Sequence, residues 1–204
     1  MSKKTIVVLA NSLKHNQHCV AGKCVVTKKW LRPVADATGR ELNHVQVKYV
    51  NPYGKFNVKP KQKIIIGLGC HAPLPNQPEN YIVDNSVWQQ HYSIDDSELM
   101  YYLDTPDNLW GENDRVPYSM ITNRTTIINQ SLYLIKVYNV KLYKNQGNKR
   151  RASFNYNNIN YDLAVTDPNF DKVFNENHGR DSILCVSLGE NFKGDCYKLI
   201  ATIF

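Results

Sequence analysis

Short runs of apolar residues, or of alternating apolar and polar residues, occupy most of the first third of the chain. The runs "TIVVLA" (5–10) and "QKIIIGLG" (62–69) are continuous and apolar, as in buried strands, whereas "HVQVKY" (44–49) alternates. The run "CVVTKKWLRPV" (24–34) indicates a strand that ends at its proline, because proline cannot donate to a strand ladder. The pattern therefore predicts mostly β-structure in this part of the chain.

The last third shows the same period of two residues. The segment "SLYLIKVYNVKLY" (131–143) alternates, and Asn157-Asn158 joins two further alternating runs as a hairpin turn would. Two more strands, 181–190 and 195–204, finish the chain with a short glycine-containing turn between them. No helix separates the strands regularly, which argues against a parallel α/β sheet. The chain is predicted to form two small β-barrels or sandwiches.

The middle of the chain, residues 72–117, departs from this pattern. It begins with the proline-rich stretch "APLPNQPENY", and "SIDDSELMYYL" (93–103) then predicts one short helix with Ser93 as its N-cap and acidic residues in its first turn. The loops around this helix are long for a compact domain, which is typical of an insertion. We therefore expect a first domain at 1–118, with an acidic loop and helix insertion at about 72–117, and a second domain at 119–204.

Composition narrows the class of protein. The chain has 204 residues, 42% of them apolar, and it lacks any run near the ~18 to 20 apolar residues that a membrane span needs. Its first apolar run has six residues, which is too short for the core of a signal peptide. Five cysteines are an odd number, so free thiols and a reducing compartment are expected. These features predict a cytoplasmic protein that does not contact a membrane.

Charge is unevenly distributed along the chain. Residues 1–63 contain 13 Lys and Arg against 2 Asp and Glu, residues 64–118 contain 1 against 9, and residues 119–204 contain 11 against 7. A strongly basic segment favours binding to nucleic acid, because its cations neutralise phosphates and release counterions. The alternative is that the acidic middle folds over the basic first part and cancels its charge.

One segment of the first third, residues 9–25, gathers lysines, histidines and cysteines around a lone glycine. Its histidines and cysteines lack the Cys-x2-Cys and His-x3–5-His spacings of zinc sites, so no metal and no cofactor is expected. A catalytic Cys19 would need a base, but adjacent residues of a strand point to opposite faces, which separates His18 from Cys19. Of the three interpretations of this segment, a basic loop that binds a polyanion requires the fewest assumptions.

The candidate binding residues lie in and just after this segment: Asn11, Ser12, Lys14, Lys23, Trp30 and Arg32. In a strand, Trp30 and Arg32 project from one face, where an aromatic ring beside a guanidinium could stack a base and follow a phosphate backbone. A structural interpretation also stays open, in which Trp30 lies in the core and Arg32 pairs with an acid such as Glu79.

Several of these stretches together resemble the dual OB-fold domain proteins of bacteria and phage-related islands. The resemblance covers residues 4–204 and is carried by "NSLKHNQHCVAGK", "WLRPV", "NQPENY", "RASFNYNNINYDLAVTDP" and "LCVSLGENFKGDCYKLIATIF". It implies an all-β fold with minor α, made of two five-stranded OB-like barrels, and a nucleic-acid connection in bacterial defence or conflict between mobile elements. It also singles out supporting positions: Cys19, Gly22, Gln77, Glu79 and Asn80.

We therefore expect a protein that binds nucleic acid, single-stranded or modified rather than ordinary duplex, through the basic face of the first barrel. This expectation requires Lys14, Lys23 and Arg32 to share one accessible surface. The acidic 79–114 segment would gate that surface or dock a protein partner. Two alternatives stay open: an enzyme acting on nucleotides or nucleic acid at the Asn11–Lys23 and Gln77–Asn80 segments, and a protein-interaction adaptor that does not contact nucleic acid.

Overall fold

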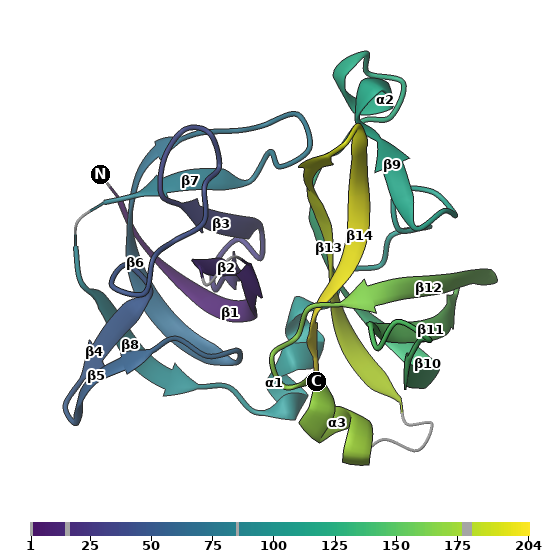
Figure 1. Cartoon of the computed structure of the whole chain (residues 1–204). Coiled ribbons are helices and arrows are strands. Elements are labelled where there is room, and N and C mark those ends of the chain that lie inside the picture. Colours follow the sequence, from purple (N-terminus) through teal and green to yellow (C-terminus); the bar gives the residue numbers. More distant parts are fainter. Residues whose placement is uncertain (1, 15–16, 85, 177–180) are drawn as a thin grey trace. The chain divides into compact units, whose positions relative to one another are not determined.

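The computed structural model describes residues 2–14, 17–84, 86–176 and 181–204 (Figure 1). The chain forms two compact units. The first comprises Met1–Leu74 and Pro78–Tyr102, and the second comprises Pro75–Gln77 and Leu103–Phe204. The sequence placed the boundary later, between residues 118 and 119. The difference arises because the segment after Tyr102 supplies a strand to the sheet of the second unit.

Five strands close the barrel of the first unit into a ring. They are β1 (Ser2–Lys14), β2 (Gln17–Cys24), β3 (Trp30–Val34), β6 (Gln62–His71) and β7 (Asn80–Val83). Their order is β1-β2-β3-β7-β6, and pairing of β6 with β1 completes the ring. Of the pairs in this ring, β3–β7 is parallel and the others are antiparallel. Apolar side chains from these strands, including Ile6, Val20, Leu31 and Ile66, fill the barrel.

Additional elements extend the first unit beyond its ring. Three strands continue the sheet: β4 (Lys48–Asn51), β5 (Gly54–Asn57) and β8 (Trp88–Ser93). The helix α1 (Asp96–Leu99) and the 3-10 turn η1 (Met100–Tyr102) follow β8. The predicted helix is therefore present, but its N-cap is Asp95 rather than Ser93, since the Asp95 carboxylate accepts from the Glu98 N–H at 2.9 Å.

The second unit contains a ring with the same connectivity. Its strands are β10 (Leu132–Lys144), β11 (Arg150–Tyr156), β12 (Ile159–Val165), β13 (Ser182–Phe192) and β14 (Asp195–Ile203). Their order is β10-β11-β12-β14-β13, β13 pairs with β10, and the β12–β14 pair is parallel. A sixth strand, β9 (Arg115–Pro117), adds to the edge of β14. Asn157 and Asn158 form the predicted hairpin turn, with φ angles of 50° and 66°.

Both rings follow the strand order 1-2-3-5-4-1, the Greek-key order of the five-stranded OB barrel. The predicted fold class, all-β with two OB-like barrels, is therefore confirmed. Two helices of the second unit escaped prediction: α2 (Tyr118–Thr122) and α3 (Phe170–Glu176). Among the described residues, no helix is long and apolar enough to cross a membrane.

A β-bulge in β10 decides which side chains face outward on the second barrel. Tyr138 pairs with Asn155 and Lys141 pairs with Ser153, so three steps along β10 match two along β11. The extra residue, Asn139, has a φ of 53°. Val137 and Val140 therefore both point into the core, while Tyr138 and Lys141 both point out.

Lys198 is a charged residue buried inside the second unit. Only 1% of the residue is exposed, and its Nζ donates to the Gly111 carbonyl at 2.7 Å and lies 5.3 Å from the Tyr161 ring. Burial lowers the pKa of the Lys198 ammonium to about 8. Below that pH the folded protein carries a desolvated charge, which opposes folding.

We predict that this cost is relieved as pH rises from about 8 to 10.5, because folded protein releases the Lys198 proton there while unfolded chain retains it. Relative to Lys198→Met, the free energy of unfolding of the unmodified protein should rise by up to about 3 kcal/mol across that window. Urea unfolding at pH 7.5 and pH 10 measures the change. Lys193→Met, at an exposed turn, serves as control. The prediction would be contradicted if the difference in the free energy of unfolding between the unmodified protein and Lys198→Met were the same at both pH values.

Candidate nucleic-acid interface

Two of the predicted binding residues, Lys23 and Trp30, are buried. Lys23 is 3% exposed and Trp30 is 4% exposed. The Lys23 Nζ donates to the Tyr102 carbonyl at 2.7 Å and lies 5.2 Å from the centroid of the Trp30 ring. The structure therefore corrects their expected role, since neither the ammonium nor the ring reaches a ligand at the surface.

The segment that follows β8 supplies partners for several lysines of the first unit. The ring of Tyr102 lies 3.9 Å from the Lys28 ammonium. Lys61 pairs with Asp96 at 2.7 Å, and Lys63 pairs with Glu98 at 3.3 Å. Part of the acidic segment thus folds against the basic first third and neutralises Lys61 and Lys63, so the alternative that the charge pattern left open holds for part of the charge.

Arg32 forms the ion pair that the structural interpretation predicted. Its Nε lies 3.3 Å from the Glu79 carboxylate, and the two side chains are 11% and 6% exposed. The backbone reinforces the pair, because the Arg32 N–H donates to the Glu79 carbonyl at 3.0 Å and Arg32 lies opposite Asn80 in the parallel β3–β7 ladder. Gln77 is grouped apart from these residues, since it belongs to the second unit.

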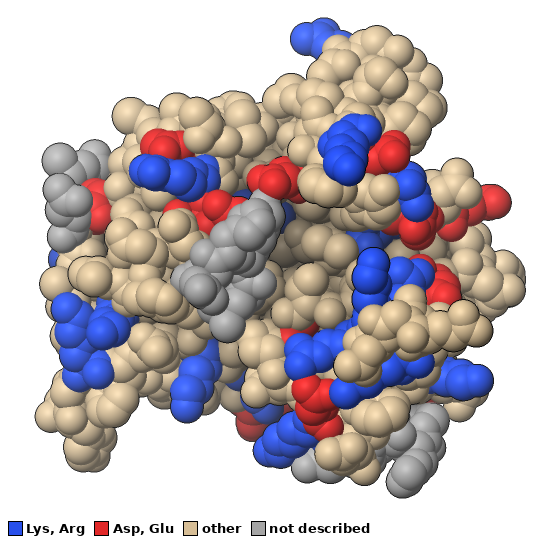
Figure 2. Space-filling model, viewed as in Figure 1, with Lys and Arg blue, Asp and Glu red and all other residues tan. Residues whose placement is uncertain are grey.

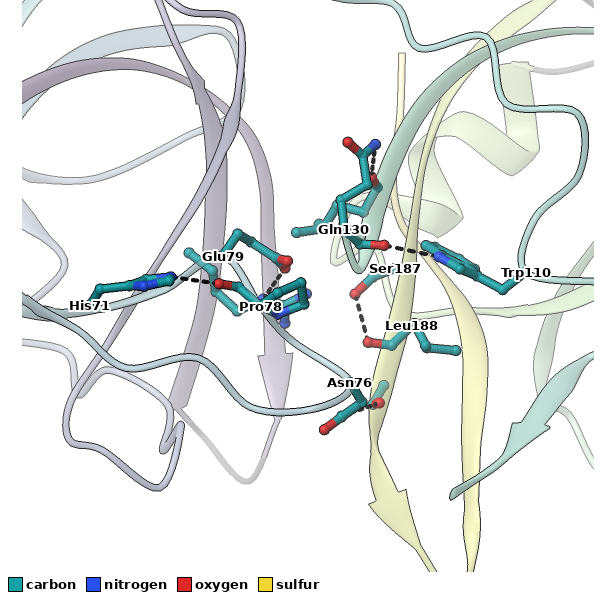
Figure 3. Close-up of polar contacts among 11 residues, drawn as sticks. His71, Asn76, Pro78, Glu79, Trp110, Gln130, Ser187 and Leu188 are labelled. Carbon is teal, nitrogen blue, oxygen red and sulfur yellow. Dashed lines mark hydrogen bonds and ion pairs between the residues drawn. The ribbon is translucent and has the colours of Figure 1, made fainter. Parts of the chain in front are cut away.

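The proline-containing loop between β6 and β7 makes polar contacts that Figure 3 draws. The exposed His71 ring contacts the Pro78 carbonyl at 2.7 Å, next to Glu79. Asn76, grouped with the second unit, donates to the Gly189 carbonyl at 3.1 Å. The Gln77–Asn80 segment is therefore divided between the two compact units.

The remaining candidates lie on β1 and β2. The Asn11 amide donates to the Val58 carbonyl at 2.7 Å, and its oxygen lies 2.9 Å from Nδ1 of His18. Burial, together with nearby His44, lowers the pKa of His18. Ser12 and Cys19 are half-buried and face each other in the ladder. The Lys14 side chain lies outside what the structure describes.

Glycine is required at position 22 for a structural reason. A Cβ at this position would lie 2.2 Å from the Val7 carbonyl oxygen, so only glycine allows β1 and β2 to approach so closely. The close approach is therefore to the neighbouring strand rather than to a ligand. Across the described residues, no three His, Cys, Asp or Glu side chains are grouped as a metal ion would require.

The second barrel presents a different surface, the outward faces of β10, β11 and β12, which we call the β10–β12 wall. Three rows cross it in register, and they are Tyr138–Asn155–Asn160, Lys141–Ser153–Asp162 and Tyr143–Arg151–Ala164. Figure 2 shows Lys and Arg side chains gathered over the part of the second unit where Figure 1 places these strands. The wall combines cations, hydroxyls and amides on one face.

Two acidic residues neutralise part of this charge. Asp162 accepts from Arg151 at 2.9 Å and also contacts the Tyr143 hydroxyl. Asp171 of α3 pairs with Lys144 at 2.8 Å and with Arg150. Within the part of the chain that the structure describes, no acid pairs with Lys136, Lys141 or Lys149, and all three are exposed. The wall and its adjoining β10–β11 loop therefore keep a net positive charge.

An exposed aromatic ring stands among these lysines. Tyr138 is 59% exposed, and the Lys136 ammonium lies 5.4 Å from the centroid of its ring. The signal for this surface was present in the sequence, because residues 115–161 contain eight Lys and Arg and no Asp or Glu. Charge counted over 119–204 as a whole concealed that run, since acidic residues follow it.

Two OB barrels in one chain define the class of dual OB-fold proteins. Comparison of the sequence with protein-family models identifies the family within that class. The chain belongs to the dual OB-containing domain family, whose model matches residues 4–203. The suspected family is thereby confirmed. A search of curated proteins found no match.

The solved structures that match this chain share little sequence with it. One is described as "Molecular basis for abrogation of activation of pro-inflammatory cytokines" (12% identity, TM-score 0.39, 100% of this chain and 92% of that chain). Another is a murine DNA-binding protein bound to double-stranded DNA (10%, TM-score 0.35, 100% and 97%). A third is tetrameric p202 HIN2 (8%, TM-score 0.32, 100% and 92%). Likeness at this level supports no conclusion about ligands.

We predict that Glu79→Gln destabilises the protein by about 3 kcal/mol, because it removes the carboxylate charge that lies 3.3 Å from the mostly buried Arg32 guanidinium. Chemical denaturation measures the change in stability. Asp36→Asn, which disrupts the exposed Asp36–Arg40 pair, is the matched control and should cost under about 1 kcal/mol. Equal effects of the two substitutions would show that burial of the Arg32–Glu79 pair is not what matters.

Proposed function

We propose that the protein binds single-stranded nucleic acid through the β10–β12 wall. The observation that carries the proposal is the combination of unpaired, exposed Lys136, Lys141 and Lys149 with the exposed ring of Tyr138. In OB barrels, the corresponding second and third strands and the loop between the first two form the surface that binds oligonucleotides. Lysines supply affinity for phosphates, and an aromatic ring stacks on bases.

The exposed ring favours a single strand over a duplex. A base must leave its helical stack before it can lie on an aromatic side chain, and single strands offer such bases without cost from unpairing. The first barrel, where the sequence placed the interface, gives less support because Lys23, Trp30 and Arg32 are largely buried. The proposal therefore keeps the ligand class and moves the interface to the second barrel.

The other functional predictions receive no added support. An enzyme site would have used Gln77 and Glu79 together, but Gln77 lies in the second unit and Glu79 pairs with Arg32. A protein partner for the 79–114 segment, a role in bacterial defence and a cytoplasmic location stay predictions.

The first test of the proposal is salt dependence. Replacing Lys136, Lys141 and Lys149 by alanine should weaken binding of single-stranded DNA and RNA. It should also reduce the slope of log K against log salt by about 2, since each neutralised phosphate contributes roughly 0.7 to that slope. Fluorescence anisotropy across salt concentrations measures both. The matched control replaces Lys48, Lys55 and Lys59 of the first unit, which removes the same charge elsewhere. Equal weakening in both triple variants, or no binding at low salt, would contradict the proposal.

A second test addresses stacking. Tyr138→Ala should weaken single-strand binding about tenfold, because one base loses its aromatic platform. Tyr138→Phe, which keeps the ring, should bind like the unmodified protein. If both substitutions weaken binding equally, the hydroxyl rather than the ring makes the contact.

A further inference from the structure

The second unit contains a cavity of about 530 Å³ outside the β10–β12 wall. Its lining comes from the loop before β9, from the loop after α2 and from the start of β10, and consists of Pro106, Asp107, Asn108, Trp110, Gly111, Thr126, Ile127 and Tyr133. Pockets that bind small ligands have volumes of about 300–1,000 Å³. The cavity is therefore large enough for a nucleoside-sized group.

The loop that forms one side of the cavity is fixed by hydrogen bonds at both ends. Its Pro106 carbonyl accepts from the Tyr156 hydroxyl at 2.9 Å and from the Asn157 amide at 3.1 Å. At the other end, the Gly111 N–H donates to the Asn108 side chain at 2.6 Å, and the Gly111 carbonyl accepts from Tyr161 at 3.0 Å. The loop therefore forms this side of the cavity before any ligand binds.

Trp110 adopts a backbone conformation that is rare for a large side chain. Its φ is +54°, and Gly111 follows at +94°. The Trp110 indole donates to the Gln130 carbonyl at 2.9 Å (Figure 3) and stacks on Tyr133, with ring centroids 4.6 Å apart and an angle of 30° between the planes. The strained backbone thus holds an aromatic pair in the lining, and unfavourable backbone conformations concentrate at binding sites.

The charge of the lining favours hydrogen-bond donors over phosphate. Among the described residues that line the cavity, Asp107 alone is charged, and its carboxylate can accept two hydrogen bonds. Among the nucleobases, guanine alone presents two adjacent N–H donors, N1–H and the 2-amino group, on one edge. A carboxylate beside an aromatic pair therefore matches guanine better than adenine, cytosine or thymine.

The cavity adjoins one end of the β10–β12 wall. Asn157 donates to the Pro106 and Asp107 carbonyls, at 3.1 and 3.2 Å, and lies in the turn that joins β11 and β12. Two residues earlier, Asn155 stands in the same row of the wall as Tyr138 and donates to Asn160 at 3.0 Å. The turn that follows this row of the wall therefore also contacts the loop that lines the cavity.

We propose that this cavity binds a guanine base, which contacts the half-buried Tyr133 ring, held in place by the largely buried Trp110, and donates to the Asp107 carboxylate. The inference rests on the proposed function, because the wall brings the strand to the cavity. It adds a sequence preference, since the wall by itself contacts phosphates and stacks any base.

The test compares three twelve-nucleotide strands: thymidine throughout, one central guanine, and one central hypoxanthine, which keeps N1–H but lacks the 2-amino group. Anisotropy should show the guanine strand binding about tenfold more tightly than the thymidine strand, with the hypoxanthine strand between them. Asp107→Asn should bring the guanine-to-thymidine ratio close to one, because an amide offers a single acceptor oxygen. Glu112→Gln, an exposed carboxylate of the same segment that does not line the cavity, should retain the ratio.

Equal affinities for the three strands, or a preference that survives Asp107→Asn, would overturn the proposal. A separate titration with free guanosine, followed by tryptophan fluorescence, tests the cavity without the wall. If the thymidine strand fails to bind at low salt, the proposed function fails. Guanosine-dependent quenching that Asp107→Asn abolishes would still support the cavity, and absence of quenching in the unmodified protein would refute it.

Discussion

The arrangement of the open surface depends on one constraint: each strand of a closed barrel must send alternate side chains inward. A regular β10 would have placed Lys141 and Tyr143 on the same side as Ile135 and Val137, inside the core. The bulge at Asn139 adds one residue and reverses the alternation, so that Lys136, Tyr138, Lys141 and Tyr143 share the outer face. Asparagine tolerates the positive φ that this conformation requires better than most residues do. A local backbone irregularity thereby assembles the cationic and aromatic side chains on a single surface.

On the first barrel, a covering segment rather than the alternation of side chains buries a cation that faces outward. Lys23 does project from the outer side of β2, since Cys24 and Val20 fill the core. The chain, however, returns over it, and a backbone carbonyl of Tyr102 accepts the hydrogen bond that a phosphate would otherwise take. Hydrogen bonds to charged groups are stronger than neutral ones, so this contact stabilises the returning segment. Outward orientation and accessibility are therefore separate properties, and only the first follows from strand periodicity.

The sequence predicted those features that depend on local pattern. Strands lie close to the predicted ranges 62–69 and 131–143, and these strands, the Asn157-Asn158 turn and the existence of a short helix near Asp96 follow from periodicity and turn propensity. The Arg32–Glu79 pair was also anticipated, as the structural alternative to phosphate binding. Features that depend on distant contacts were not predicted. Helix α3 begins after buried Asp167, which accepts from the Asn169 and Ile203 N–H groups, and Ile203 lies far along the chain. Burial raises the pKa of this carboxyl although those hydrogen bonds oppose the shift.

The two barrels share one topology but differ in how their cations are paired. Their rings share strand order and the single parallel pair, yet the chain segment that connects the third ring strand to the fourth differs between them. In the first barrel it contains the β4–β5 hairpin, and in the second it contains α3. Asp171 of α3 holds Lys144 and Arg150 at one end of the wall without reaching the lysines farther along it. These ion pairs hold the two ends of the β10–β11 loop and leave Lys136, Lys141 and Lys149 without an acidic partner among the described residues. In the first barrel, Asp96, Glu98 and the Tyr102 carbonyl bind Lys61, Lys63 and Lys23. A recognition surface needs cations that are positioned but not satisfied, and the second barrel offers Lys136 and Lys141 on one wall beside the exposed ring of Tyr138.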